Sequence, residues 1–208
     1  MSADGAAPCY ADDLWPGMAE TIARYGRPLV RALTLPVSAD TMDDWQNERS
    51  HRAAEVVLLL RRPNGRYLVH TKSFYPTGVF RLLSGGIHAG EPLLEAAQRE
   101  AYEETGRAAA VERFVGELRY LFVHGERRRA FRSFLFELAL GEGPLCPTDT
   151  DEAITAYRDV TLAELAEIAT QLEQLPPDWG DWGRFRATAH RLALEALAQR
   201  PRSDIERG

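Results

Sequence analysis

Residues Gly85 to Arg107 read GGIHAGEPLLEAAQREAYEETGR and decide how the rest of the chain is interpreted. Three carboxylates in this segment, Glu100, Glu103 and Glu104, are spaced i, i+3 and i+4, so a helix over 91–105 would project them from one face. They fall in its last turns, where the helix macrodipole disfavours each acid by about 0.3–1 kcal/mol. A hard dication such as Mg²⁺ would reverse that penalty, because it prefers carboxylate oxygens. Leucines and alanines supply the apolar contacts of the segment, so we expect the acidic face to lie off the core; a solvated surface is the alternative to a metal site.

The wider pattern of the segment resembles the Nudix box, which is a glycine, five residues, a glutamate, seven residues and then Arg-Glu-apolar-x-Glu-Glu-x-Gly-apolar. The residues in register with it are Gly85, Glu91, Arg99, Glu100, Ala101, Glu103, Glu104 and Gly106. The resemblance covers about 53–172. It departs from the family pattern at Arg107, where an apolar residue is usual, and at Ser84, where many members have proline. It implies that Arg99 and Glu91 form a structural pair holding the loop against the helix, with a weak surface ion pair as the alternative.

The same resemblance implies a metal site and a catalytic role for its ligands. The side-chain ligands would be Glu100, Glu103 and Glu104, binding one or more Mg²⁺ ions, with Mn²⁺ able to replace them. The carbonyl of Gly85 or Gly86 would be the backbone ligand, and we expect these glycines to need positive φ so that the backbone can approach the metal. Carboxylate-held Mg²⁺ acts as a Lewis acid and template and lowers the pKa of a bound water.

In the Nudix family a further glutamate, often in a loop after the last strands, assists as a ligand or base. The resemblance assigns this catalytic role to Glu152, in the segment TDTDEAITAYRDV. A loop acid without a role is the alternative interpretation of Glu152. Glu137 and Asp151 are the alternative residues.

Three side chains before the box are expected to bind the substrate. Lys72, the only lysine of the chain, and Arg81 flank the loop that leads to the box, where cationic groups can meet phosphates. Tyr75 can stack on a base or pack in the core. The run Arg127 to Arg129 is interpreted as a solvated hairpin tip rather than a phosphate site.

Strands and helices are predicted in mixed order along the rest of the chain. The expected strands are 29–37, 55–60, 66–71, 80–83, 114–123 and 131–140, and the expected helices are 15–25, 91–105, 162–172 and 184–199. Asn64-Gly65 predicts a hairpin between the second and third strands, and Thr161 with Glu164 predicts a capping box. This order favours an α/β fold, a Nudix-type α/β/α sandwich with a mixed sheet. We expect an N-terminal extension over 1–52, the Nudix hydrolase domain over 53–172 and a C-terminal helical extension over 173–208.

Composition limits the kinds of partner. The chain has 208 residues, 45% of them hydrophobic and 27% charged, which is ordinary for a soluble globular protein. A net charge of −6 argues against a general nucleic-acid binder. The first residues lack the features of a signal peptide, and no apolar run approaches the ~20 residues that span a bilayer. We therefore expect a cytoplasmic protein with a small-molecule diphosphate substrate and neither nucleic-acid nor membrane partners.

The resemblance implies a Mg²⁺-dependent hydrolase that acts on acid anhydrides, cleaving a diphosphate linkage in a nucleoside diphosphate derivative. One alternative is a catalytically silent Nudix-fold module that senses nucleotides, although the acidic positions of the box are intact. Another is an isomerase of isopentenyl diphosphate, a family that uses an active-site cysteine, whereas Cys9 and Cys146 lie outside the matched strands. Nucleotide sugars, ADP-ribose, dinucleoside polyphosphates and damaged nucleoside triphosphates all stay open as substrates.

The strand expected at 29–37 lies outside the matched region and would leave an unpaired edge. We therefore expect a homodimer in which residues before Ala53 contribute to the interface. The alternative is a monomer in which this strand folds back onto its own subunit.

Overall fold

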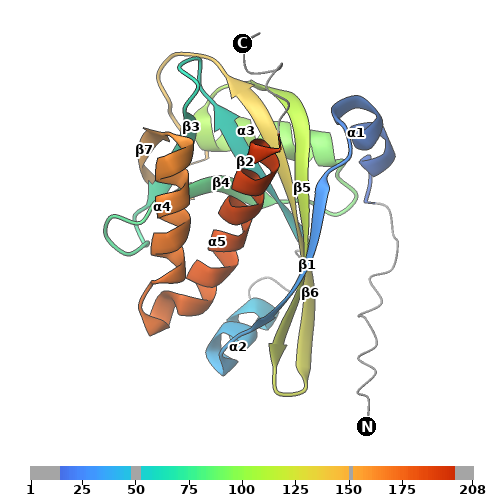
Figure 1. Cartoon of the computed structure of the whole chain (residues 1–208), viewed down its shortest axis with the longest axis vertical. Coiled ribbons are helices and arrows are strands. Elements are labelled where there is room, and N and C mark those ends of the chain that lie inside the picture. Colours follow the sequence, from blue (N-terminus) through green and yellow to red (C-terminus); the bar gives the residue numbers. More distant parts are fainter. Residues whose placement is uncertain (1–14, 48–52, 150–151, 200–208) are drawn as a thin grey trace.

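The computed structural model describes residues 15–47, 53–149 and 152–199. Its centre is a seven-stranded mixed sheet with the order β1-β5-β6-β2-β4-β3-β7 (Figure 1). The strands are β1 (Leu29–Pro36), β2 (Ala54–Arg61), β3 (Tyr67–Lys72), β4 (Arg81–Gly86), β5 (Ala109–His124), β6 (Arg127–Leu140) and β7 (Ile154–Val160). The helices are α1 (Met18–Tyr25), α2 (Ala39–Asn47), α3 (Leu93–Thr105), α4 (Leu162–Glu173) and α5 (Pro177–Ala198). The predicted α/β fold with a mixed sheet is confirmed.

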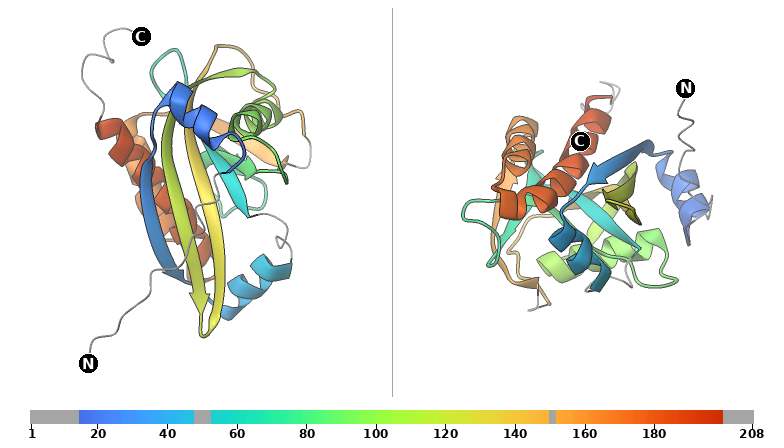
Figure 2. Two further views of the ribbon diagram at one scale, coloured as in Figure 1. Left: turned by 90° about the vertical axis from the view of Figure 1, so that its right-hand side faces the viewer. Right: turned by 90° about the horizontal axis from the view of Figure 1, so that it is seen from below.

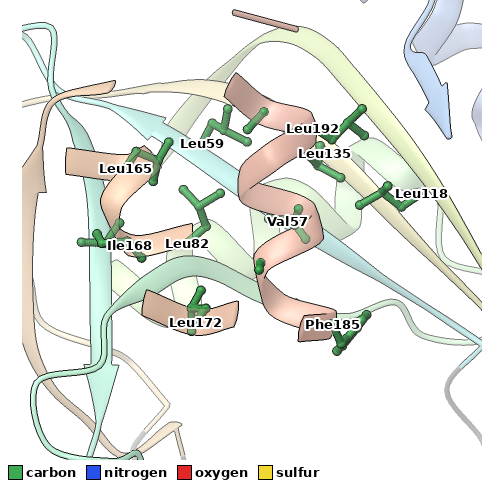
Figure 3. Close-up of a cluster of buried hydrophobic side chains, with 14 of the residues drawn as sticks. Val57, Leu59, Leu82, Leu118, Leu135, Leu165, Ile168, Leu172, Phe185 and Leu192 are labelled. Atoms are coloured by element: carbon green, nitrogen blue, oxygen red, sulfur yellow. The ribbon is translucent and has the colours of Figure 1, made fainter. Parts of the chain in front are cut away.

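Helices cover both faces of this sheet, which makes β2 a buried central strand. Val57 and Leu59 belong to the core beneath α4 and α5, and Figure 3 shows them in one cluster with Leu165 of α4 and Leu192 of α5. The alternate β2 residues pack on the opposite face against α3 and α1. A strand buried on both faces reads as a continuous apolar run, which is why this segment is EVVLLL and not an alternating pattern.

The predicted hairpin between β2 and β3 forms only at its turn. Gly65 has φ of 76° and its N–H donates to the carbonyl of Arg62 at 2.9 Å, as an Asn-Gly turn requires. Beyond the turn, Arg61 and Tyr67 are the single registered pair of the two strands. Strand β4 lies between them, pairing with β2 on one side and β3 on the other. A strand has two edges, and those of β2 are taken by β4 and β6.

Three segments differ from the sequence predictions. Strand β7 was not among the predicted strands, and it pairs antiparallel with β3. The arginines at 127–129 belong to β6 instead of a hairpin loop. Helix α5 begins at Pro177 and not near 184, so the glycines of PPDWGDWG are helical. A Cβ on Gly183 would collide with the carbonyl of Leu172, so this glycine permits close packing of α5 on α4 and does not break the helix.

Strand β1 is an edge strand, as predicted, and it folds back onto its own subunit. It pairs in parallel with β5, from Leu29 opposite Gly116 to Pro36 opposite Val123. Figure 2 shows it beside the long β5–β6 pair, with α1 and α2 toward opposite ends of these strands. The leucines of β1 pack on the same core as α4 and α5. The division of the chain at 52 and 172 remains a prediction. In the parts of the chain described, no helix is long and apolar enough to cross a membrane.

Candidate metal and catalytic site

The expected metal ligands lie on α3, and their burial corrects one expectation. The helix packs Leu93, Ala96, Ala97 and Ala101 on the sheet and ends at Gly106, whose φ of 70° is the predicted left-handed C-cap. Glu100 and Glu104 lie on this buried side, with 5% and 0% of their surface exposed, whereas Glu103 is half-buried. The acidic face therefore turns into the protein, and two of its three carboxylates are shielded from water.

Arg99 connects the box loop, strand β4 and helix α3. Its Nε and Nη2 donate to the two carboxylate oxygens of Glu91 at 2.7 and 2.9 Å, and Nη2 also donates to the carbonyl of Gly86 at 2.9 Å. Its Nη1 donates to Glu100 and to Glu103, both at 2.8 Å. The Arg99–Glu91 contact expected from the sequence is present, and these bonds lower the pKa of Glu91. The alternative of an isolated surface ion pair is wrong, because the Arg99 guanidinium donates hydrogen bonds to four acceptor groups.

Gly85 and Gly86 occupy ordinary extended backbone, so the expectation of positive φ is wrong. Both lie in β4, opposite Val56 and Glu55 of β2, and neither has a left-handed φ. The need for glycine at position 85 has a different cause: a Cβ there would overlap the carboxylate of Glu100. Burial raises the pKa of that carboxyl to about 7, against the opposing effect of Arg99.

Glu104 lies deepest of the acids and faces strand β3. Both of its carboxylate oxygens are buried without a hydrogen-bond partner, and burial raises its pKa to about 8. Its Oε1 is 3.5 Å from the Nζ of Lys72 and 3.7 Å from the Nδ1 of His70. Burial, with the nearby cations, holds the pKa of His70 well below its usual range, so this imidazole is neutral at pH 7.

His70 was missed in the sequence, although one signal was available. It lies near the end of the predicted strand 66–71, two residues before Lys72, and side chains two apart share a face if the strand continues. Both of its ring nitrogens are buried and have no hydrogen-bond partner among the described residues. This spacing from Lys72 could have indicated that His70 lies beside the expected metal ligands of α3. Tyr157 of β7 was also missed; its hydroxyl donates to the backbone carbonyl of Glu104.

Glu152 reaches the site through Lys72. The ammonium of Lys72 contacts the Glu152 carboxylate, and 9% of this lysine side chain is exposed. The backbone is irregular on both sides of the contact: the β3–β7 register shifts between Thr71 and Lys72, and Ala153 has φ of 52°. Irregular backbone of this kind is concentrated at functional sites.

The two alternative acids fare differently. Glu137 is buried in β6 and accepts a hydrogen bond of 2.9 Å from the hydroxyl of Tyr67. Its cationic neighbours include Arg61 and Arg113. Asp151 lies outside the described residues.

Arg81 and Tyr75, predicted to bind substrate, contact each other inside the protein. The Nε of Arg81 donates to the Tyr75 hydroxyl at 2.7 Å, and its Nη1 donates to the Oγ of Ser84 at 2.9 Å. Ser84 also accepts from Arg186 of α5 at 3.2 Å, and Arg186 donates to Glu55 at 2.7 Å. This buried network joins α5 to the strand that carries Gly85. Direct contact of Arg81 or Tyr75 with substrate stays a prediction.

The donors present have the chemistry of a magnesium site. Hard cations take carboxylate oxygens, and the buried Glu104 oxygens have no hydrogen-bond partner. Across residues 15–47, 53–149 and 152–199, no three acidic, histidine or cysteine side chains converge closely enough to hold a metal ion. Arg99 and Lys72 bind oxygens of the remaining acids. The residues therefore fit a divalent cation once these contacts rearrange.

Comparison with known proteins identifies the family of this chain. Residues 50–182 match the family model of the NUDIX domain. Phosphatase NudJ of Escherichia coli strain K12 and of Shigella flexneri are each 30% identical over 104 residues, which cover 50% of this chain and 65% of the relative. The match thus spans less than two thirds of these relatives.

Among solved structures, the Escherichia coli ORF135 protein aligns at 18% identity and a TM-score of 0.49, covering 72% of this chain and 93% of that one. The family-model match covers more than half of the chain and includes the complete box together with the strands and helix around it. The chain therefore belongs to the Nudix hydrolase family.

Proposed function

We propose that this protein is a Mg²⁺-dependent hydrolase that cleaves a diphosphate linkage in a nucleoside diphosphate derivative. The observation that carries the proposal is the pair of buried acids, Glu100 and Glu104, which stand one helical turn apart, with Glu100 against the Gly85 backbone and Glu104 against strand β3. Burying acids without a partner is costly, and a divalent cation would offset that cost. The relatives named NudJ are described as phosphatases, which supports a phosphorus-containing substrate.

The roles of the chain's own groups follow from their positions. Glu100 and Glu104, with Glu103 after a side-chain rotation, would hold Mg²⁺, which supplies Lewis-acid stabilisation of phosphate oxygens and a bound water of lowered pKa. Arg99 fixes the carbonyl of Gly86 and the box loop relative to α3. Lys72 lies beside Glu104 and contacts Glu152, so this cation and this second acid would be available to a diphosphate bound at the metal.

The test compares Glu104→Gln with Glu95→Gln, an exposed glutamate on the same helix. Loss of charge stabilisation at the transition state should lower kcat of Glu104→Gln by about 10²-fold or more. Stability without metal should be equal or slightly higher, since the variant removes an acid whose ionised form is disfavoured by burial. Chelator should abolish the wild-type activity and Mg²⁺ or Mn²⁺ restore it, while Glu95→Gln behaves as wild type.

Substrates should be screened by mass detection of products from nucleotide sugars, ADP-ribose, dinucleoside polyphosphates and nucleoside triphosphates. Full activity in Glu104→Gln would rule out the assignment. Metal-dependent binding of these compounds without any turnover would favour the second candidate, a nucleotide-sensing module. We further propose that the protein is a homodimer.

A further inference from the structure

Two cationic side chains, Arg99 and Lys72, pair with the acids of the candidate site, and they differ in how many other contacts fix them. The acid cluster consists of Glu100, Glu103, Glu104 and Glu152. Arg99 donates hydrogen bonds to Glu100 and Glu103. It is also fixed by a bidentate hydrogen bond to Glu91 and by a hydrogen bond to the Gly86 carbonyl. Removing Arg99 from the cluster would break the connection between loop and helix. It is therefore a structural cation.

Lys72 has no comparable anchor. Within the described residues, the ion pairs of its ammonium are with Glu104 and Glu152 alone. A lysine ammonium is a compact point charge on a flexible stem, so it can leave one position for another without distorting the backbone. Its partners are oxygens that a divalent cation would also take. Lys72 thus neutralises the part of the cluster that Arg99 does not reach.

The backbone is shaped to bring this lysine and Glu152 together. The register shift at Thr71/Lys72 turns the end of β3, and the N–H of Ser73 donates to the carbonyl of Ala153 at 3.0 Å. Ala153 is held in the left-handed region, which an alanine adopts at a cost. The surrounding structure holds Ala153 in this conformation, and with it the backbone beside the Lys72–Glu152 contact.

We propose that Lys72 is a displaceable counter-ion: it neutralises Glu104 and Glu152 in the metal-free protein, is expelled when a divalent cation binds, and is then free to meet a substrate phosphate. The idea rests on the proposed function, since it requires a metal site and an anionic substrate. A divalent cation on these carboxylate oxygens would repel an ammonium a few ångströms away, so metal binding weakens the lysine contact. Metal loading would thereby release the cation that the substrate needs.

The first experiment measures Mn²⁺ affinity without substrate, from the electron paramagnetic resonance signal of free Mn²⁺. Wild type is compared with Lys72→Met, which keeps the side-chain length and removes the charge. The control is Arg191→Met, which removes an exposed cation paired with Glu173 between α5 and α4. Removing a competing charge a few ångströms away should tighten Mn²⁺ binding in Lys72→Met by about tenfold. Arg191→Met should bind as wild type does.

The second experiment follows the lysine itself. Because Lys72 is the only lysine in the chain, labelling lysine with ¹³C at Cε gives a single lysine side-chain signal. Titration of wild type with Mg²⁺ should shift this signal saturably, with the midpoint of metal binding. In Glu152→Gln the metal-free signal should already lie closer to that of a solvent-exposed lysine.

The outcomes separate this inference from the proposed function. Equal Mn²⁺ affinity in wild type and Lys72→Met, with an unmoved Cε signal, would overturn the counter-ion role and leave the hydrolase proposal intact. Tighter binding in Lys72→Met together with the Cε shift supports it, even if no diphosphate is hydrolysed. Absence of Mn²⁺ binding in every protein would overturn both.

Discussion

A hydrogen atom in place of a side chain at Gly85 is what lets the Glu100 carboxylate lie against strand β4. The adjacent residue, Ser84, also makes a specific buried contact. Ser84 stands where many family members have proline, and its hydroxyl accepts from both Arg81 and Arg186. This departure therefore serves a buried contact to α5 that proline could not make. Small changes at 84 and 85 should act on the position of Glu100 more than on the fold.

Gly85→Ala tests the close approach. The added Cβ must displace the end of a flexible side chain, not backbone, so the domain should still fold. Moving Glu100 by about 1 Å should weaken Mn²⁺ binding and lower kcat by roughly tenfold to 10²-fold. The control is Gly141→Ala, where a Cβ would make only an ordinary contact with Arg107. Unchanged Mn²⁺ affinity and kcat in Gly85→Ala would contradict the close approach.

Helix α5 is attached to the central sheet through His190 as well as through Arg186. The Nε2 of His190 accepts from the N–H of Leu82 at 3.1 Å, and its Nδ1–H donates to the carbonyl of Arg186 at 3.0 Å. This pattern requires a neutral imidazole with its proton on Nδ1. Burial lowers the pKa of His190 to about 4. The attachment of α5 is therefore sensitive to acid.

His190→Gln tests the acid sensitivity. A depressed folded-state pKa means that the unfolded chain binds the proton more readily, so the stability is present above pH 6.5 and is lost as pH falls toward 4. Between pH 7 and pH 5 wild type should lose about 2 kcal/mol more unfolding free energy than His190→Gln, which cannot titrate there. Urea unfolding at both pH values measures the difference. Parallel losses in the two proteins would show that His190 does not titrate in this range.

At the scale of the whole molecule, the outer edge of β1 has no partner strand within residues 15–47, 53–149 and 152–199. The structure pairs its inner edge with β5, which is the arrangement expected of a monomer, yet its outer edge can still receive a second copy. Val30 on this strand is 40% exposed. The proposed homodimer would cover this edge.

Light scattering on the full chain tests the dimer with two matched variants. Val30→Lys places a charge on the edge strand and should convert a dimer into a monomer without unfolding it. Leu162→Lys changes an equally exposed residue, at 43%, on the opposite side of the domain at the start of α4, and should leave the mass unchanged. A monomeric mass for the wild-type protein at micromolar concentration would end the proposal.

Local chemistry was readable from the sequence alone. The spacing of the box placed three glutamates on one helix, Gly106 ended that helix, and Thr161 with Glu164 capped the next, because these interactions span only a few residues. The mixed α/β fold and the edge position of β1 followed from the order of apolar segments and from its proline.

Long-range pairing was decided by the tertiary structure. The Asn-Gly turn was correct, but the sheet placed β4 between the two strands that it joins, because strand edges are shared across the whole molecule. The burial of Glu104, its neighbours His70 and Lys72, and the approach of Glu100 to Gly85 each depend on elements distant in sequence. Sequence spacing determines which side chains share a face of one helix or strand; only packing determines what that face meets.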